Sequence, residues 1–250
     1  MQIKIAAPTN RFFIVTLVLV SFLSGISSLT MADDKLIELK VGYLEIPPLY
    51  TTQTGARPTG ELADILFGTL DKAGFSYSYQ VFPPTRLYKN MASGATDLST
   101  AIKGQALYDN NVMFGKKVLM YLEQRIYAMG DRPIPVTVDG LLGKKIALKR
   151  DYGYGGDYVK LTAPGNLPFV APVNSPEHAL AMLQSGRVDF VLDYKDPVTA
   201  LIETLHIPNV HYKTIRKIPV YFLISRRTPN YQQILIALDD HFVPALPLHH

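Results

Sequence analysis

The same pattern of turn-forming residues occurs twice in this chain, 92 residues apart, in PTRLYKNMASGATD and PEHALAMLQSGRVD. Both segments have a Pro, a Ser-Gly pair and an Asp at equal spacing: Pro84, Ser93, Gly94 and Asp97, then Pro176, Ser185, Gly186 and Asp189. A Pro favours the first turn of a helix, and a Gly supplies the left-handed residue that ends one. The apolar segments LSTAI and FVLDY follow, as short strands would. One helix-to-strand unit is therefore predicted twice.

A unit used twice predicts two similar α/β lobes with a cleft between them. Elsewhere the patterns predict strands at 36–45, 75–82, 115–129 and 167–173, a loop at 47–60 and a helix at 60–72. The turn-rich segment 130–135 is predicted to end the first lobe. The later segment VHYKTIRKIPVYFLIS is again predicted to form strands. The last helix, in TPNYQQILIALDDHFVPAL, is expected to pack on the first lobe. Because strands alternate with helices, each lobe should be Rossmann-like, with a mainly parallel sheet.

The first 32 residues predict where the protein works. Lys4 and Arg11 are the only charges before Asp33, and the apolar run FFIVTLVLVSFLSGISSLTMA fades into small residues. This is the pattern of a secretory signal peptide, with cleavage expected near Ala32 and Ser28 as a competing site. An uncleaved membrane anchor is the alternative, but the serines make the second half of the run too polar for one.

The composition narrows the classes of function. There is no Cys, which excludes disulfides, a thiolate nucleophile, Cys-based metal sites and lipidation on Cys, so an exported protein should be free in a periplasm. The net charge is +4, of which Lys4 and Arg11 supply two, and the remaining cations are scattered, so no nucleic-acid partner is expected.

Catalytic and metal-binding motifs are not found in the sequence. GxSxG, HExxH and the EF-hand loop do not occur, and the six His fall outside the loops expected to bind a ligand. Asp239-Asp240-His241 lies on the last predicted helix, where adjacent residues point in different directions, and is expected to be a solvated face. We therefore predict no catalytic residue, metal or cofactor.

Six segments between residues 36 and 245, in order, resemble the amino-acid-type extracellular solute-binding proteins of ABC importers. They are VGYLEIPPLY, GELADILFGTLDKAGF, LYKNMASGATDLSTAI, GLLGKKIALKRDYGYGG, HALAMLQSGRVDFVLDY and YFLISRRTPNYQQILIALDDHF. The resemblance implies the type II periplasmic binding protein fold, with lobe 1 at 33–129 plus 218–250, lobe 2 at 130–217, and crossovers near Ala128–Arg132 and Lys217–Tyr221. It also implies a monomer that closes by hinge motion on a small solute and docks transiently on a membrane permease.

In parallel α/β sheets ligands lie at the carboxyl ends of the strands, which selects the candidate site residues. They are Tyr50, Arg86, Ser99, Thr100, Lys103, Arg150, Tyr152, Tyr154, Asp193 and Tyr194. In the family an aromatic near Tyr50 stacks on the solute, hydroxyls such as Ser99 and Thr100 bind it, and an acid near Asp193 or Tyr194 holds an amine. Packing in the core or rim is the alternative role of Tyr50.

The family arginine that holds a ligand carboxylate has no counterpart here, since Ala106-Leu107-Tyr108 stand in its place. Arg86 or Lys103 could substitute for it. Arg86 opens a helix, where a cation is unfavourable unless an anion is near, so Arg86→Ala is expected to nearly abolish binding. The glycine-rich loop 150–156 could offer backbone N–H groups to an anion, or be an ordinary β-to-α turn.

The predicted function is capture of a polar amino acid or related small organic anion for an ABC importer, without enzymatic activity. Two alternatives stay open: a secreted enzyme on the same scaffold, similar to cyclohexadienyl dehydratases, and a sensory binding protein that does not serve transport. The missing arginine favours the sensory alternative. Ligand-dependent stabilisation would separate a binding protein from a chain that has lost its ligand.

Overall fold

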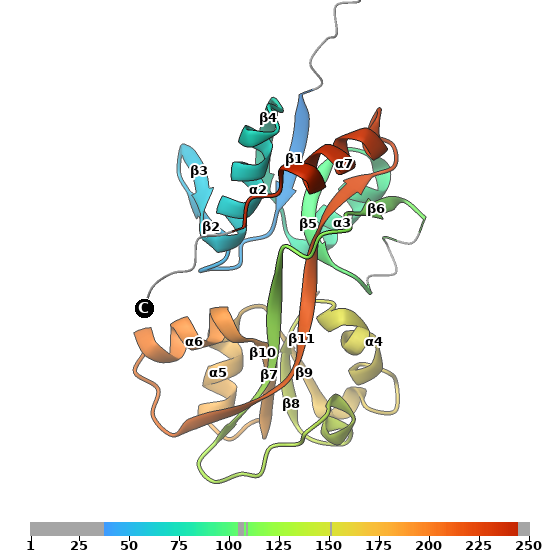
Figure 1. The fold of residues 1–250 in the computed structure, drawn as a ribbon. Coiled ribbons are helices and arrows are strands. Elements are labelled where there is room, and N and C mark those ends of the chain that lie inside the picture. Colours follow the sequence, from blue (N-terminus) through green and yellow to red (C-terminus); the bar gives the residue numbers. More distant parts are fainter. Residues whose placement is uncertain (1–37, 105–107, 109, 151, 245–250) are drawn as a thin grey trace, which may run out of the picture. The chain divides into compact units, whose positions relative to one another are not determined.

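The first strand set consists of three parallel strands with two helices packed beside them (Figure 1). The computed structural model describes residues 38–104, 108, 110–150 and 152–244, so the predicted leader lies outside the described residues. The strands are β4 (Tyr77–Val81), β1 (Leu39–Tyr43) and β5 (Leu98–Ile102), with β1 in the middle. The helices are α2 (Glu61–Lys72) and α3 (Pro84–Ser93). Leu62, Ile65, Leu66 and Leu70 of α2 are buried, as their helical spacing predicts.

The second strand set repeats this arrangement with later residues. Its parallel strands are β10 (Phe190–Tyr194), β8 (Ile146–Lys149) and β9 (Val170–Val173). Helices α4 (Asp157–Leu161), α5 (Pro176–Gln184) and α6 (Lys195–Thr204) belong to this part of the chain, together with the 3₁₀ helices η2 (Val138–Leu141), η3 (Tyr154–Gly156) and η4 (Leu167–Phe169). The predicted two-lobed, mainly parallel α/β fold is confirmed at this level.

Two long antiparallel strands join the two sets into one nine-stranded sheet (Figure 1). They are β7 (Met120–Met129) and β11 (Val210–Ser225), with β6 (Val112–Phe114) on the edge of β11. β11 pairs with β5 through residues 220–224, and β7 pairs with β10 through residues 124–127. β11 therefore pairs with the first set and β7 with the second, and the crossovers predicted at Ala128–Arg132 and Lys217–Tyr221 stay predictions. The predicted lobe boundaries themselves stay a prediction.

The repeated helix-to-strand unit has the same backbone geometry in both copies. Gly94 and Gly186 have φ values of 78° and 70°, the left-handed conformation that ends a helix at low cost in glycine. The N–H of Asp97 then donates to the carbonyl of Lys40 at 2.8 Å, and that of Asp189 to the carbonyl of Lys145 at 2.7 Å. Each Asp therefore starts a strand beside the first strand of its own set, which confirms the repeat.

Local differences from the sequence prediction occur where turns and tertiary contacts compete with simple periodicity. Residues 47–60, expected to be a loop, contain the hairpin of β2 (Thr51–Gln53) and β3 (Ala56–Thr59), which turns at Gly55 with φ 72°. The strand expected over 167–173 is preceded by η4, so only β9 is extended. Helix α6 was not predicted, because Pro197 in its first turn reads equally as a loop residue.

The last helix, α7 (Tyr231–His241), packs on α2 and β11, next to the first strand set as predicted. One expectation for this helix was wrong. Asp239 is not on a solvated face: it is buried, and its carboxylate accepts the backbone N–H groups of Lys116 and Lys117 at 2.8 and 3.3 Å. These two hydrogen bonds to the Asp239 carboxylate hold the loop before β7 against α7.

Across the described part of the chain, no helix has the length and apolar character needed to cross a bilayer. Within the same residues, no three His, Asp or Glu side chains gather closely enough to hold a metal ion.

Candidate functional site

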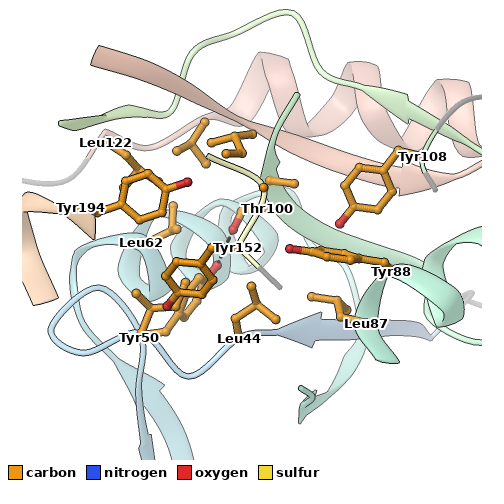
Figure 2. Close-up of a pocket in the computed structure, with 15 residues that line it drawn as sticks. Leu44, Tyr50, Leu62, Leu87, Tyr88, Thr100, Tyr108, Leu122, Tyr152 and Tyr194 are labelled. Carbon is orange, nitrogen blue, oxygen red and sulfur yellow. Dashed lines mark hydrogen bonds between the residues drawn. The ribbon is translucent and has the colours of Figure 1, made fainter. Parts of the chain in front are cut away.

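A cavity of about 70 Å³ lies where the two strand sets meet, and its wall is apolar and aromatic (Figure 2). Fifteen residues line it: Leu44, Ile46, Tyr50, Leu62, Leu87, Tyr88, Thr100, Ala101, Ile102, Tyr108, Leu122, Tyr152, Gly153, Tyr194 and Val220. Among the described residues that form this wall, none carries a charged side chain.

The strand ends explain why these residues meet. Leu44 directly follows β1, Ile102 ends β5, Tyr152 lies just after β8, and Tyr194 ends β10. The carboxyl ends of parallel strands form the usual ligand edge of an α/β sheet, and here both strand sets turn that edge toward one cavity. A molecule in the cavity would therefore touch both halves of the chain.

Tyr50 and Thr100 form the polar corner of the cavity. The two hydroxyls are 2.9 Å apart and hydrogen-bonded, and Tyr50 is only 2% exposed (Figure 2). The Tyr43 ring supports Tyr50 from outside the wall, with ring centroids 5.4 Å apart. Burial raises the pKa of the Tyr50 phenol, so this hydroxyl stays neutral and acts as both donor and acceptor.

Tyr152, Tyr154 and Tyr194 form a cluster of three rings on the other side. Their centroids lie 5.3 to 5.8 Å apart, a range typical of tilted and edge-to-face contacts. Tyr152 and Tyr194 line the cavity, whereas Tyr154 stands behind them, its hydroxyl accepting the N–H of Lys149 at 2.9 Å. Burial raises the pKa of all three phenols well above the usual value, so the wall presents neutral hydroxyls.

Asp193 is fully buried beside this cluster but does not line the cavity. One carboxylate oxygen accepts the N–H of Tyr194 at 2.8 Å, and the other has no hydrogen-bond partner. Burial raises the pKa of Asp193 to about 7, and the Tyr194 N–H and the charge of Lys149 offset only part of that effect. The carboxyl group expected to hold a ligand amine lies outside the lining.

The other predicted charged residues also lie away from the cavity wall. Arg86 is exposed on α3, in a surface depression with Pro83 and Lys89. The Lys103 ammonium lies 4.5 Å from the centre of the Tyr221 ring, in a separate depression. Arg150 is exposed and donates to the carbonyl of Pro172 at 3.1 Å.

Ser99 is buried and does not line the cavity, while its neighbour Thr100 does. Thus Tyr50, Thr100, Tyr152 and Tyr194 of the predicted set come together, whereas Arg86, Ser99, Lys103, Arg150, Tyr154 and Asp193 do not line the same cavity.

Arg216 accounts for the geometry of the glycine-rich loop. Its guanidinium donates to the Tyr154 carbonyl, the Asp157 carboxylate and, at 2.6 Å, the side-chain oxygen of Gln124. It packs so closely that a Cβ on Gly155, whose φ is 61°, would lie 3.0 Å from it. The guanidinium of Arg216, on β11, thus lies against the loop that was predicted to bind an anion. Asp151 of this loop lies outside the described residues.

Most of the apolar wall was not anticipated, although one signal was available. Leu87, Tyr88 and Met91 are buried on α3 at helical spacing, which places Arg86 on the other side of that helix. This stripe would have selected Tyr88 over Arg86 as the residue facing inward. In the sequence Tyr108 stands in the place of the family arginine, and in the structure it lines the cavity.

Arg86→Ala is now expected to leave ligand affinity within about twofold of the unchanged protein, because the side chain lies on the exposed face of α3. Isothermal calorimetry with any ligand found for the cavity checks this. The neighbouring Tyr88→Ala is the matched comparison on the same helix, and we expect it to weaken binding. If Arg86→Ala loses binding and Tyr88→Ala does not, the prediction is wrong and Arg86 binds the ligand.

No protein-family model matches the chain, and no curated protein matches it by sequence. Solved structures do. A histidine kinase sensor domain with similarity to periplasmic binding proteins is 17% identical over 83% of this chain and 90% of its own, with a TM-score of 0.69. The GluR0 ligand-binding core in complex with L-glutamate is 17% identical over 82% of this chain and 92% of its own, with a TM-score of 0.66.

The arginine-, lysine-, histidine-binding protein ArtJ from Geobacillus stearothermophilus is also similar, at 17% identity, 82% coverage of this chain, 89% of its own, and a TM-score of 0.64. Identity at this level establishes the fold alone. The arrangement of strands and the similarity to these structures agree, and the chain has the fold of periplasmic binding proteins.

Proposed function

We propose that this protein binds a small solute in the cavity between its two strand sets. The observation that carries the proposal is the wall itself, to which the carboxyl ends of strands from both sets contribute. Such a ligand would bridge the halves and favour the closed arrangement, since a ligand stabilises the conformation that it contacts best. Proteins of the same fold bind L-glutamate, or arginine, lysine and histidine, which supports a binding role.

The proposed setting is the periplasm, after removal of the leader near Ala32, with delivery of the solute to an ABC permease. The signal-peptide pattern supports export, and the fold is compatible with delivery. A sensory role is the second candidate, favoured by the similarity to a histidine kinase sensor domain. Both roles require the same ligand-binding step, and they differ in the membrane protein that responds to the ligand-bound form.

We further propose that the protein is not an enzyme. Acid-base catalysis needs a titratable group whose pKa is near the working pH and which reaches the substrate. The titratable groups in the described wall are tyrosines, and burial raises the pKa values of Tyr50, Tyr108, Tyr152 and Tyr194. Incubation with a cyclohexadienyl acid is therefore expected to give no product.

Filling the cavity tests the binding function. In Ala101→Phe, a ring replaces a methyl group in the wall beside Tyr88 and Tyr108, and it would occupy space needed by a ligand. We expect at least one solute from a broad panel to raise the melting temperature of the unchanged protein, and affinity for it to fall at least about a hundredfold in Ala101→Phe. Thermal melts followed by calorimetry measure both quantities.

Ala56→Phe is the matched control, because Ala56 is an exposed residue of β3 that does not line the cavity. It should keep the affinity of the unchanged protein. A panel without any stabilising solute, or a solute whose affinity is the same in Ala101→Phe, would contradict binding in this cavity.

A further inference from the structure

The polar side chains among the described residues of the cavity wall carry hydroxyl groups. Tyr50, Tyr88, Thr100, Tyr108, Tyr152 and Tyr194 supply them, and the remaining described wall residues are aliphatic or glycine. Figure 2 shows the hydroxyls of Tyr88 and Tyr194 directed into the cavity from opposite sides. A neutral hydroxyl donates one hydrogen bond and also accepts hydrogen bonds, so this wall matches uncharged hydroxyl or carbonyl groups. None of the described wall residues offers a charged side chain to a ligand.

Charged residues near the wall are directed elsewhere. The Lys149 ammonium lies 3.8 Å from the centre of the Tyr152 ring, and Asp193 is bonded to the backbone of Tyr194. Glu61, at the start of α2, is close enough to Asp196 and Lys195 for their charges to affect its pKa, and none of these three residues lines the cavity. A charge on a ligand in the cavity would therefore lack a direct partner among the described residues.

The energetic consequence is selection against charge. Moving an ion out of water is costly unless an opposite charge and hydrogen bonds replace the water, and a zwitterion carries two such groups. Burial shows the same preference for the neutral form when it raises the pKa values of the Tyr152 and Tyr194 phenols. A neutral ring, in contrast, gains from contact with several aromatic side chains.

We infer that the cavity selects a small uncharged ring compound that carries a hydroxyl group, and that it rejects free α-amino acids. This inference rests on the proposed binding function and names its ligand class. The cavity volume of about 70 Å³ restricts the ligand to a small compound, since one water molecule already takes up about 30 Å³ in the liquid.

Four probes that share one ring and differ in charge test the inference: 4-(2-hydroxyethyl)phenol, which is neutral, tyramine, which is a cation, 4-hydroxyphenylacetate, an anion, and L-tyrosine, a zwitterion. We expect the neutral probe to raise the melting temperature and to bind at least about tenfold more tightly than each charged analogue by calorimetry. Tyr194→Phe removes one wall hydroxyl and keeps the ring, so it should weaken the neutral probe about threefold to tenfold.

Tyr79→Phe is the control, because Tyr79 is 40% exposed on β4 and does not line the cavity. It should bind the neutral probe as the unchanged protein does. A charged analogue that binds as tightly as the neutral probe overturns the inference, and so does a set of four probes without any binding.

The broad solute panel separates this failure from failure of the proposed function. If amino acids or organic anions stabilise the protein and the neutral probe does not, the ligand class is wrong and solute binding stands. If nothing in the panel or the probe series binds, solute binding in this cavity is wrong as well.

Discussion

Gly60→Ala is expected to destabilise the protein by about 3 to 5 kcal/mol, among the largest effects of any single methyl group here. Gly60 precedes α2 with φ 117° and ψ 164°, a conformation that other residues strongly disfavour. A Cβ there would lie 2.1 Å from the carbonyl oxygen of Pro48 and 2.5 Å from that of Leu49. These are backbone atoms, and the Leu49 carbonyl also accepts the N–H groups of Leu62 and Ala63, so the loop has little freedom to move away.

The same loop carries Ile46 and Tyr50 to the cavity wall, so Gly60→Ala should also weaken ligand binding. Urea denaturation measures the loss of stability. Gly68→Ala is the matched control: Gly68 lies inside α2, and an added Cβ would meet nothing within 4 Å. It should stabilise the protein by about 0.5 to 1 kcal/mol, because alanine favours a helix over glycine. Equal stability of the two variants would contradict the strained position of Gly60.

Asp193→Asn is expected to make the protein more stable at pH 8, on the order of 3 to 4 kcal/mol, with little change near pH 4. The folded-state pKa of Asp193 is about 7, raised mainly by burial, whereas an unfolded Asp has a pKa of about 3.9. Between these values the folded state holds a proton that the unfolded state has lost. Stability of the unchanged protein therefore falls as pH rises from about 4 to about 7, and then levels off.

Asparagine cannot ionise, so Asp193→Asn should lose this pH dependence. Denaturation at a series of pH values measures the difference between the two proteins, which removes the shared contribution of Asp196, whose pKa burial also raises. Asp240→Asn changes an exposed carboxylate on α7 and should follow the unchanged protein at every pH. If Asp193→Asn is instead less stable at pH 8, the Asp193 carboxylate is stabilised by a charge partner such as Lys149.

The architecture was accessible from the sequence because local signals and burial patterns agree along the chain. Gly94 and Gly186 end their helices in the left-handed conformation that their spacing predicted. The apolar spacing of α2 predicted its buried face. These features depend on backbone propensities and periodicity within a few residues, so no tertiary information was needed to read them.

The composition of the site was accessible only in part. Tyr50, Thr100, Tyr152 and Tyr194 lie at the strand ends that the α/β rule selects, and they do line one cavity. Arg86 was selected by the same rule and by its charge, yet it is on the exposed face of α3. Position in sequence places a residue near a strand end, but the rotation of a helix by about 100° per residue decides which side chain faces inward.

By itself, the sequence determined most of the strands and helices in their order, the repeated unit and the glycines that end α3 and α5. Only the tertiary structure decided the chemistry of the cavity, because its wall is assembled from segments as distant as Leu44 and Val220. It also decided that Asp193 is buried beside tyrosines and that Arg216 occupies the glycine-rich loop. The burial and the neighbours of a charged side chain depend on how distant segments pack, so the sequence alone does not show which charges can contact a ligand.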